Sequence, residues 1–289
     1  MDPVIENILR SWTFEPWIII SLSLGAIIYL RGWRQLHRRL PRRFALWRLI
    51  AFQSGVLTLF LALASPLHEL AERLLQFHMV QHLLLMMVVP PLLLLGAPIL
   101  PLLRGLPRPV LQHALRYVFA SASLQRLGRF LTHPVVCVLA FTVSNVAWHL
   151  PALYELALRS EFWHDVQHIC FLGTGLLFWW PVVQPWPSRL RWPRWTMIPY
   201  LLFADIQNTA LSAFLIFSER VLYPSYAAVP RLWGISVLDD QAAAGAIMWV
   251  PGSVIFLVPV VVLVIGLFDS SPTRSAMSKK VNYEAVKVE

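Results

Sequence analysis

Charged side chains are scarce in this chain of 289 residues: Asp, Glu, Lys and Arg together make up only 13% of it. That is about half the share found in soluble globular proteins. Hydrophobic residues reach 57% instead, and a soluble domain of this length has too little interior to bury so many of them. The composition therefore excludes a soluble enzyme and predicts a polytopic membrane protein.

Lysine and cysteine are also rare, which excludes a retinal bound to a membrane lysine and a disulfide framework. The lysines are Lys279, Lys280 and Lys287, all in the tail, so no membrane helix offers an amine for a retinal-type Schiff base. The cysteines are Cys137 and Cys170, which are too few for a disulfide framework. We place Cys137 near the inner end of its helix, so we expect no disulfide between the two.

The beginning of the chain lacks the basic segment that opens a secretory signal peptide. It carries Asp2 and Glu6 instead, and no small-residue cleavage site follows the first apolar run. We therefore expect no removable signal peptide, and we count the first apolar run as a membrane helix.

Apolar runs that approach the roughly 20 residues needed to cross a bilayer recur along the chain. They predict seven transmembrane helices, at about residues 12–30, 46–64, 78–103, 135–150, 162–180, 197–217 and 242–268. The third run contains four prolines, so we expect a kink or a break there. The predicted fold is all-α, with one membrane domain over residues 1–268 and a polar, disordered tail over 269–289.

Basic residues are concentrated in alternate loops. The segments 31–48, 104–133 and 184–195 contain arginine but no acidic residue, and together with the tail they hold 19 of the 24 basic residues. By the positive-inside rule this side faces the cytoplasm, which places the N-terminus outside and the C-terminus in the cytoplasm. The net charge of +9 is thus a topology signal in the cell (inner) membrane, and we expect no nucleic-acid partner. Residues 107–130 predict a basic amphipathic segment on the membrane surface.

The nine histidines divide by membrane side. His37, His113 and His133 fall in the inner basic loops, where we interpret them as neighbours of water or lipid headgroups. The other six map to the outer, periplasmic or extracellular side: His68, His78, His82, His149, His164 and His168. Histidine within a membrane is costly unless it is paired, so this grouping needs partners.

Two of these histidine pairs have helical spacing. His78 and His82 are four residues apart, as are His164 and His168, so each pair shares one helix face about 6 Å along the axis. Together with His149 at matched depth, the pairs can converge on one ion. Neutral imidazole binds copper, zinc, iron and nickel. We predict a metal site from these five histidines; the alternative is that they bond to polar groups within the bundle or face water at the lipid headgroups.

Other residues are candidates for further ligands or for supporting contacts. His68 lies in the nearby outer loop. Met86 continues the stripe of His78 and His82, and Met248 lies at a comparable depth; thioether sulfur favours Cu(I), although methionine also fills packing gaps. Asp165 and Asp240 can fix the tautomer of a ligand histidine, and Asp240 can instead cap its helix.

Asp205 lies inside the sixth predicted span, apart from the outer cluster. An intramembrane carboxylate is a candidate functional residue by default. The sequence leaves two roles open, which are to bind a proton or to satisfy Arg194 or a polar neighbour.

Taken together, these segments resemble the membrane-integral cytochrome c oxidase assembly factor family CtaG, of the seven-helix kind. The matching stretches are 65–68, 78–82, 90–91, 96–98, 148–154, His164 with His168, 178–181, 239–241 and 244–249. The resemblance covers roughly residues 15–268. It implies a role in maturing haem–copper oxidases, through delivery or handling of copper.

Four functions are compatible with the pattern. The first is an assembly factor, not an enzyme, that holds Cu(I) in the histidine cluster and passes it by ligand exchange to the oxidase catalytic subunit or another copper-site subunit. The second is a copper transporter or channel, which needs polar groups across the membrane, for which Gln53, Asn145, Asp205, Gln207 and Asn208 are available. The third is a b-type haem protein with one axial histidine from each of two helices. The fourth is a scaffold without metal. The oligomeric state is not predicted.

Overall fold

The computed structural model describes residues 6, 10–107, 109–112, 121–188 and 192–269. Within these residues all regular structure is helical, which confirms the all-α prediction. The predicted disordered tail falls on residues 270–289, which lie outside the described part of the chain.

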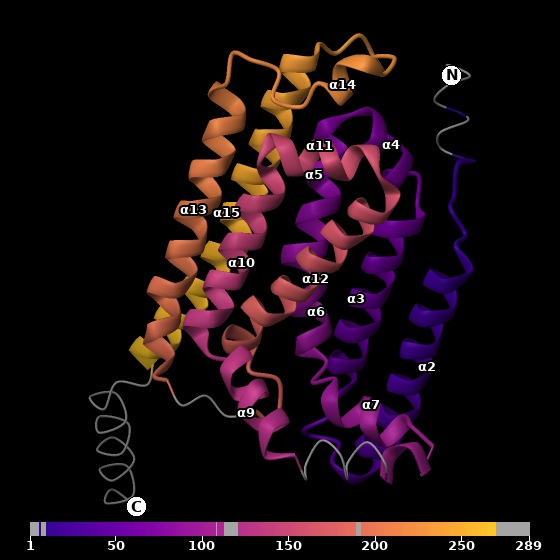
Figure 1. The fold of residues 1–289 in the computed structure, drawn as a ribbon. Coiled ribbons are helices and arrows are strands. Elements are labelled where there is room, and N and C mark those ends of the chain that lie inside the picture. The colour runs from indigo at the N-terminus through magenta and orange to yellow at the C-terminus, as the bar shows by residue number, and fades with distance from the viewer. Residues whose placement is uncertain (1–5, 7–9, 108, 113–120, 189–191, 270–289) are drawn as a thin grey trace, which may run out of the picture.

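The long helices run side by side between two ends of a bundle (Figure 1). They are α2 (Pro16–Arg39), α3 (Leu46–Ala64), the composite third span α5 (Leu75–Leu83), η1 (Leu84–Val88) and α6 (Val89–Leu95), then α10 (Pro134–His149), α12 (Glu161–Val183), α13 (Met197–Phe217) and α15 (Val237–Asp269). By length and composition, the third span and four of the helices qualify alone as membrane spans, as does α13 together with the preceding turn η2 (Arg194–Thr196).

The fourth predicted span, α10, is the exception. It has 16 residues, which is about 24 Å of helix and short of a hydrocarbon core of about 30 Å. It qualifies only when joined to α9 (Ala122–Leu131), from which it is bent by 64°. The described chain therefore has six candidate spans, or seven when this bent pair counts as one.

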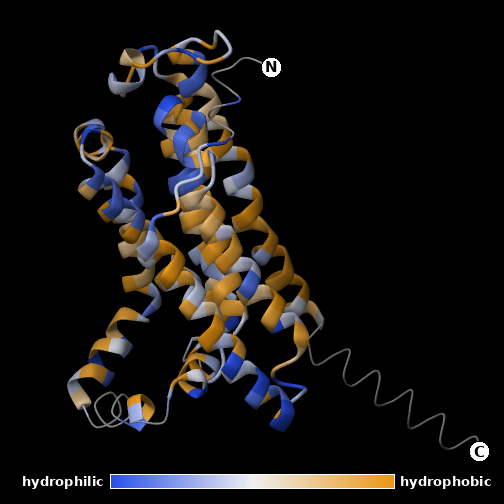
Figure 2. Cartoon of the chain, turned by 90° about the vertical axis from the view of Figure 1, so that its right-hand side faces the viewer, coloured by the Kyte–Doolittle hydropathy of each residue, from blue (hydrophilic) through white to orange (hydrophobic). Residues whose placement is uncertain are grey.

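Shorter helices lie at the two ends of the bundle (Figure 1). The histidine end contains α4 (Leu67–Arg73), α11 (Pro151–Arg159), α14 (Ser225–Ala228) and the first turns of α5, α12 and α15. The arginine end contains α7 (Ile99–Gly105), α9 and the loop 40–45. Hydrophilic residues gather at both ends and hydrophobic residues cover the shafts between them (Figure 2). This is the distribution expected when the middle of a helical bundle lies in hydrocarbon.

The basic segment predicted for the surface is described only in part. Residues 108 and 113–120, which include His113, lie outside the described residues. The rest contains α9, in which no residue is buried and in which arginines alternate with exposed apolar residues: Leu124, Arg126, Leu127, Arg129 and Phe130. This described part is helical and amphipathic, as predicted.

The third span is interrupted twice around its prolines. The π-helical turn η1 ends at Val88, two residues before Pro90, and α6 ends at Leu95 before Ala97, whose φ is 50°. Such a left-handed residue ends a helix. The chain then turns into α7, which packs backbone to backbone on α2, since a methyl group on Gly32 would collide with the carbonyl of Pro101. The predicted break is confirmed, and it ends the span at Leu95 rather than near residue 103.

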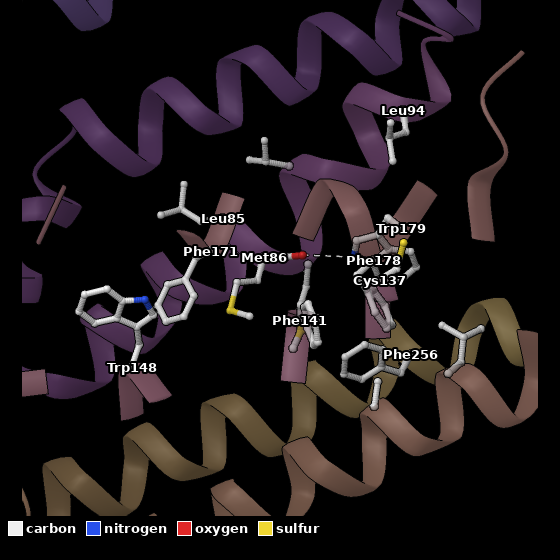
Figure 3. Packing of buried hydrophobic residues seen from close by; sticks show 14 of the residues in the cluster. Leu85, Met86, Leu94, Cys137, Phe141, Trp148, Phe171, Phe178, Trp179 and Phe256 are labelled. Atoms are coloured by element: carbon white, nitrogen blue, oxygen red, sulfur yellow. Dashed lines mark hydrogen bonds between the residues drawn. The ribbon is translucent and has the colours of Figure 1, made fainter. Parts of the chain in front are cut away.

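An aromatic core fills the middle of the bundle between the third span, α10, α12 and α15 (Figure 3). The rings of Phe141 and Phe178 stack with centroids 4.3 Å apart, and Phe256 meets Phe178 edge-on at 5.7 Å. Stacked and edge-on aromatic pairs add to the stabilisation that comes from burial. Cys137, within this core, and Cys170 are both free thiols, as predicted.

Candidate metal centre

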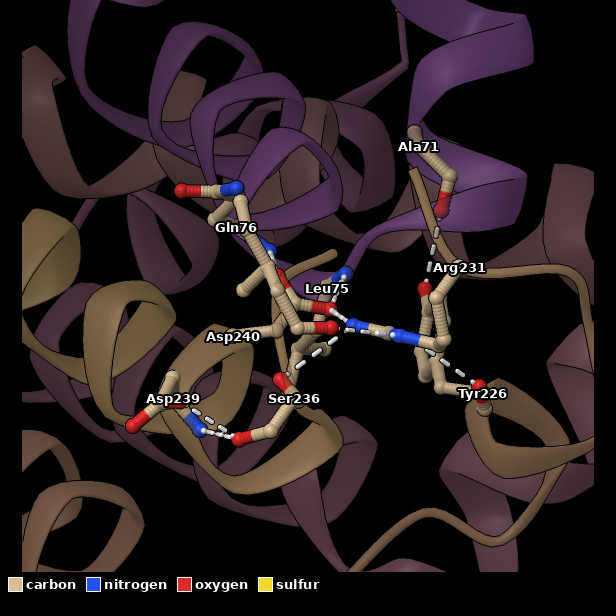
Figure 4. Close-up of polar contacts among 9 residues, drawn as sticks. Ala71, Leu75, Gln76, Tyr226, Arg231, Ser236, Asp239 and Asp240 are labelled. Carbon is tan, nitrogen blue, oxygen red and sulfur yellow. Dashed lines mark hydrogen bonds and ion pairs between the residues drawn. The ribbon is translucent and has the colours of Figure 1, made fainter. Parts of the chain in front are cut away.

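The start of α5 is fixed by a carboxylate from another helix. Asp240 of α15 is fully buried and accepts hydrogen bonds from the backbone N–H of Leu75 at 2.9 Å and of Gln76 at 3.1 Å (Figure 4). The free N–H groups at a helix N-terminus favour an anion. Arg231 lies 3.2 Å from the same carboxylate and balances its charge.

This arrangement differs from both roles that the sequence left open for Asp240. Among the described residues, the Asp240 carboxylate contacts the N-terminus of α5 and Arg231, and neither a histidine ring nor the N-terminus of its own helix. Asp240 therefore acts on the histidines through the position of α5. Its neighbour Asp239 accepts a hydrogen bond from the Ser236 hydroxyl at 2.6 Å.

The two helices that carry the histidine pairs are held together below the cluster. Pro90 has no N–H, so the carbonyl of Met86, four residues earlier, lacks its usual helical donor. The indole of Trp179 on α12 donates to this carbonyl instead, at 3.2 Å (Figure 3). Gly175 allows the approach, since a methyl group there would lie 2.8 Å from the same oxygen.

The structure brings the two predicted histidine pairs together. Nitrogen atoms of His78, His82 and His168 lie within 4.8 Å of one another, and all three residues are buried. The fourth member, His164, is adjacent, with its Nε2 atom 3.4 Å from Nε2 of His78. Residues 86 positions apart in the chain thus share one pocket.

His149 and His68 each lie next to a different member of the two pairs. His149 comes from the last turn of α10, and its ring centroid lies 5.8 Å from that of His82. His68, on α4, has its ring centroid 5.6 Å from that of His164. All six histidines that the sequence assigns to the outer side thus lie together. We call them the histidine cluster: His68, His78, His82, His149, His164 and His168.

Hydrogen bonds fix the tautomers of two of these rings. Nδ1 of His149 lies 2.6 Å from the Asn145 carbonyl oxygen. Nδ1 of His78 lies 2.7 Å from the Tyr226 hydroxyl, whose own proton goes to the Ala71 carbonyl at 2.9 Å (Figure 4). The Nδ1 atom of each of these two rings must therefore carry the proton and donate it. Each Nε2 atom is then left with a lone pair instead of a proton. Burial raises the pKa of Tyr226 well above its usual value, so the hydroxyl stays protonated.

Several ring nitrogens of the cluster are buried without a hydrogen-bond partner among the described residues. They are Nε2 of His149, Nε2 of His168 and both nitrogens of His82. A buried polar atom without a partner costs free energy, and neutral imidazole is a common ligand for transition metals. The donor set therefore fits a transition-metal ion, with Tyr226 and the Asn145 carbonyl placed to orient His78 and His149 as the outer partners of ligand histidines usually do.

Tyr226 was not singled out from the sequence. It lies in the short helix α14, 148 residues after His78, and no spacing rule connects a loop tyrosine to a helix histidine. The only sequence signal was its place in a loop on the same predicted side as the six histidines. Tyr154, which lay within a stretch that carries the family resemblance, also contacts His78, with ring centroids 5.2 Å apart.

The two candidate methionines lie in apolar surroundings. Met86 belongs to the aromatic core, as Figure 3 shows, and Met248 belongs to a second apolar cluster with Met79 and Tyr154. These positions match the packing role that the sequence allowed as an alternative. We therefore do not include either sulfur among the ligands that the geometry supports.

The remaining polar candidates bond to neighbouring helices. Asp205 accepts a hydrogen bond from Ser253 at 2.7 Å, which is the polar-neighbour role left open by the sequence. Asn145 donates to Gln207 at 3.3 Å, and Asn208 donates to the Met248 carbonyl at 2.9 Å. These contacts join α13 to α10 and α15, so they hold the bundle together at the level of its interior.

A cavity of about 1050 Å³ lies beside the histidine cluster. His68, His78, His164 and His168 line it, together with Asp165 and residues of α2 such as Trp17. The cluster is therefore buried but borders open space, so a small ion could reach it.

Fold and site together define a polytopic helical membrane protein with a buried histidine cluster at one end. Residues 27–270 match the family described as Cytochrome c oxidase caa3 assembly factor (Caa3_CtaG). Because this match covers most of the chain, the protein belongs to that family.

The curated relatives are mycobacterial proteins whose names assign no function. The chain is 29% identical over 260 residues to Uncharacterized protein Mb0105 of Mycobacterium bovis and to Uncharacterized protein MT0111 of Mycobacterium tuberculosis, which covers 86% of this chain and 38% of each relative. It is 26% identical over 273 residues to Uncharacterized protein ML1998 of Mycobacterium leprae, covering 92% of this chain and 40% of the relative. The chain thus spans about two fifths of the length of these relatives. Comparison with solved structures gives no match.

Proposed function

We propose that this protein binds copper in the buried part of the histidine cluster, at His78, His82 and His168, and delivers it to a copper site of haem–copper cytochrome c oxidase. The observation that carries the proposal is the convergence of His78, His82 and His168, whose nitrogens lie within 4.8 Å of one another in a buried pocket. Family membership supports the oxidase as the client. No bond of a substrate is made or broken, so the role is assembly rather than catalysis.

Cu(I) is the form of the metal that this site suits best. It accepts low coordination numbers, and its ligands exchange between similar sites. Three buried imidazoles can hold it, and His149 and His164 stand close enough to replace one of them during transfer. An ion held in this way can leave for an acceptor site with comparable ligands.

We propose further that the histidine end faces the periplasm or cell exterior. The segments 31–48, 104–133 and 184–195, whose described parts lie at the opposite end, contain arginine but no acidic residue, and the positive-inside rule assigns such segments to the cytoplasm. Copper would then be received and released on the outer side of the cell membrane.

A copper-binding measurement on the purified full-length protein tests the proposal. The protein is loaded anaerobically with Cu(I) in competition with a chromogenic chelator. The wild type is expected to retain copper, and the variant His82→Ala/His168→Ala is expected to lose it. A matched control, His37→Ala/His133→Ala, removes two histidines near the arginine end and should bind as the wild type does.

Three results would change the assignment. No copper on the wild-type protein after loading would overturn the proposal, and a Soret band on the protein as purified would favour haem instead. Copper uptake by vesicles that contain only this protein would favour transport over delivery, although Asn145, Asn208 and Asp205 are engaged in hydrogen bonds between helices.

A further inference from the structure

The histidines of the cluster form a graded series from the surface inward. The His68 side chain is 27% exposed, His164 is half-buried, and His78, His82 and His149 are buried. Neighbouring ring centroids along this series, from His68 through His164, His78 and His82 to His149, lie 5.6, 5.2, 4.3 and 5.8 Å apart. Each imidazole is therefore within reach of an ion held by the one before it.

The cavity at the exposed end of this series carries excess negative charge. Glu15, Glu72, Glu161 and Asp165 line it. Its two arginines are already paired with glutamates, Arg73 with Glu69 at 2.6 Å and Arg159 with Glu155 at 3.1 Å. The remaining carboxylates attract cations, because a concave site lined by one sign of charge raises the local concentration of the opposite sign.

Two observations at the cavity wall indicate that the attracted cation is a metal ion and not simply any positively charged group. His168 lines the cavity, is 7% exposed, and its Nε2 atom has no hydrogen-bond partner among the described residues. Nε2 of His78 and Nε2 of His164 are 3.4 Å apart. Two nitrogens that bind one ion tetrahedrally at about 2.0–2.1 Å lie about 3.3 Å apart, so His164 and His78 can bind the same ion briefly while it moves from the outer ligands to the buried ones.

We propose that His68, Glu72 and His164 form a loading station for copper at the cavity wall, separate from the buried site of His78, His82 and His168. The proposal rests on the proposed function and adds a second, weaker metal site with a direction of movement. His68 Nε2 lies 3.7 Å from the Glu72 carboxylate, and both side chains are partly exposed, so they can turn toward an arriving ion.

The ligand types give the movement its direction. A carboxylate oxygen is a hard ligand and holds Cu(I) weakly, whereas imidazole nitrogen holds it better. A cation captured at Glu72 and His68 therefore gains affinity when His164 and then His78 replace the outer ligands. The oxidation state does not change, and each step exchanges one ligand for another on the same ion.

The test is the rate at which the full-length protein takes up Cu(I) from a chelator in a stopped-flow experiment. In the variant His68→Ala/Glu72→Gln, uptake should slow by about tenfold or more, while the affinity and stoichiometry of the tightly held copper stay at wild-type values. The second, weaker equivalent should be lost. The control Glu219→Gln removes one negative charge at the histidine end outside the cavity lining and should load at the wild-type rate.

The possible outcomes distinguish failure of the loading station from failure of the proposed copper-binding function. Wild-type uptake rates and two retained equivalents in His68→Ala/Glu72→Gln would overturn the loading station and leave the buried site standing. Loss of the tight equivalent in that variant would also overturn it, because the two sites would then be one. A wild-type protein that takes up no copper would overturn the proposed function itself, and the loading station with it.

Discussion

Tyr226 controls which nitrogen of His78 is available to a metal. Its hydroxyl proton goes to the Ala71 carbonyl, so its oxygen can only accept from Nδ1 of His78. The lone pair of Nε2 then faces the cluster. A histidine that binds a metal commonly donates its other N–H to such a partner, which fixes the tautomer and the ring orientation.

Replacing Tyr226 by phenylalanine tests this role. The ring stays, but Nδ1 of His78 loses its acceptor, so the tautomer is no longer fixed. We expect Cu(I) affinity to fall by about 10–100-fold, measured by competition with a chelator. The matched control is Tyr223→Phe, which removes a hydroxyl that donates to the His149 backbone at 2.9 Å and leaves both fixed Nδ1 contacts in place. Equal affinities for the two variants would count against the tautomer argument.

Replacing Asp240 by asparagine tests its role as the cap of α5. In Asp240→Asn the buried cap of α5 loses its charge, and Arg231 loses its ionic partner. Removing one partner of a charged hydrogen bond costs about 2 kcal/mol, so the unfolding midpoint should fall clearly. Asp239→Asn, next to it, should change the midpoint little, because Asp239 is exposed and its hydrogen bonds among the described residues are local ones with Ser236. Intrinsic fluorescence during heating measures both, and a similar shift for the two variants would argue against the cap.

At the scale of elements, the contact between η1 and α12 aligns the two histidine pairs. Pro90 frees the Met86 carbonyl, Trp179 donates to it, and Gly175 lets the helices approach. A helix pair held at one point below the cluster keeps His164 and His168 level with His78 and His82.

Gly175→Leu should therefore disrupt the site without touching a histidine. The added side chain meets the Met86 backbone and the Pro90 ring, and such overpacking typically costs 1–3 kcal/mol. We expect a lower unfolding midpoint and reduced copper retention. Gly173→Leu is the control in the same helix, because a methyl group at Gly173 meets nothing within 4 Å. Copper retention that is unaffected in Gly175→Leu would show that this contact does not align the pairs.

The sequence predicted the elements well where hydropathy controls them and less well where packing does. The spans 46–64 and 197–217 match α3 and α13, because their ends coincide with the ends of apolar runs. The first span was predicted to end at residue 30, yet α2 continues to Arg39, since Trp33 and Leu36 bury one face of a helix that is otherwise basic.

The grouping of the histidines could be predicted because four-residue spacing and a common membrane side are both sequence properties. The contacts that orient them could not be predicted. Tyr226 meets His78 across 148 residues and Asp240 meets Leu75 across 165, and neither contact leaves a periodic pattern. They arise only when the loop 218–236 and the start of α15 fold back onto α4 and α5.

At the scale of the whole molecule, the distribution of arginine predicts which end faces the cytoplasm. A reporter that is active only in the cytoplasm, fused after residue 289, should be active, and one fused in the loop 218–236 should be inactive. A reporter that is active only outside the cytoplasm should give the opposite pattern. Activity of the cytoplasmic reporter in that loop would contradict the proposed orientation and place the histidine cluster on the wrong side for delivery from outside.

The central claim is that imidazoles from separate helices bind one copper ion, and X-ray absorption spectroscopy of the Cu(I)-loaded full-length protein tests it most directly. We expect a first shell of nitrogen with the outer-shell pattern of imidazole, absent from His82→Ala/His168→Ala. A first shell dominated by sulfur, or the same imidazole spectrum from that double variant, would contradict the account.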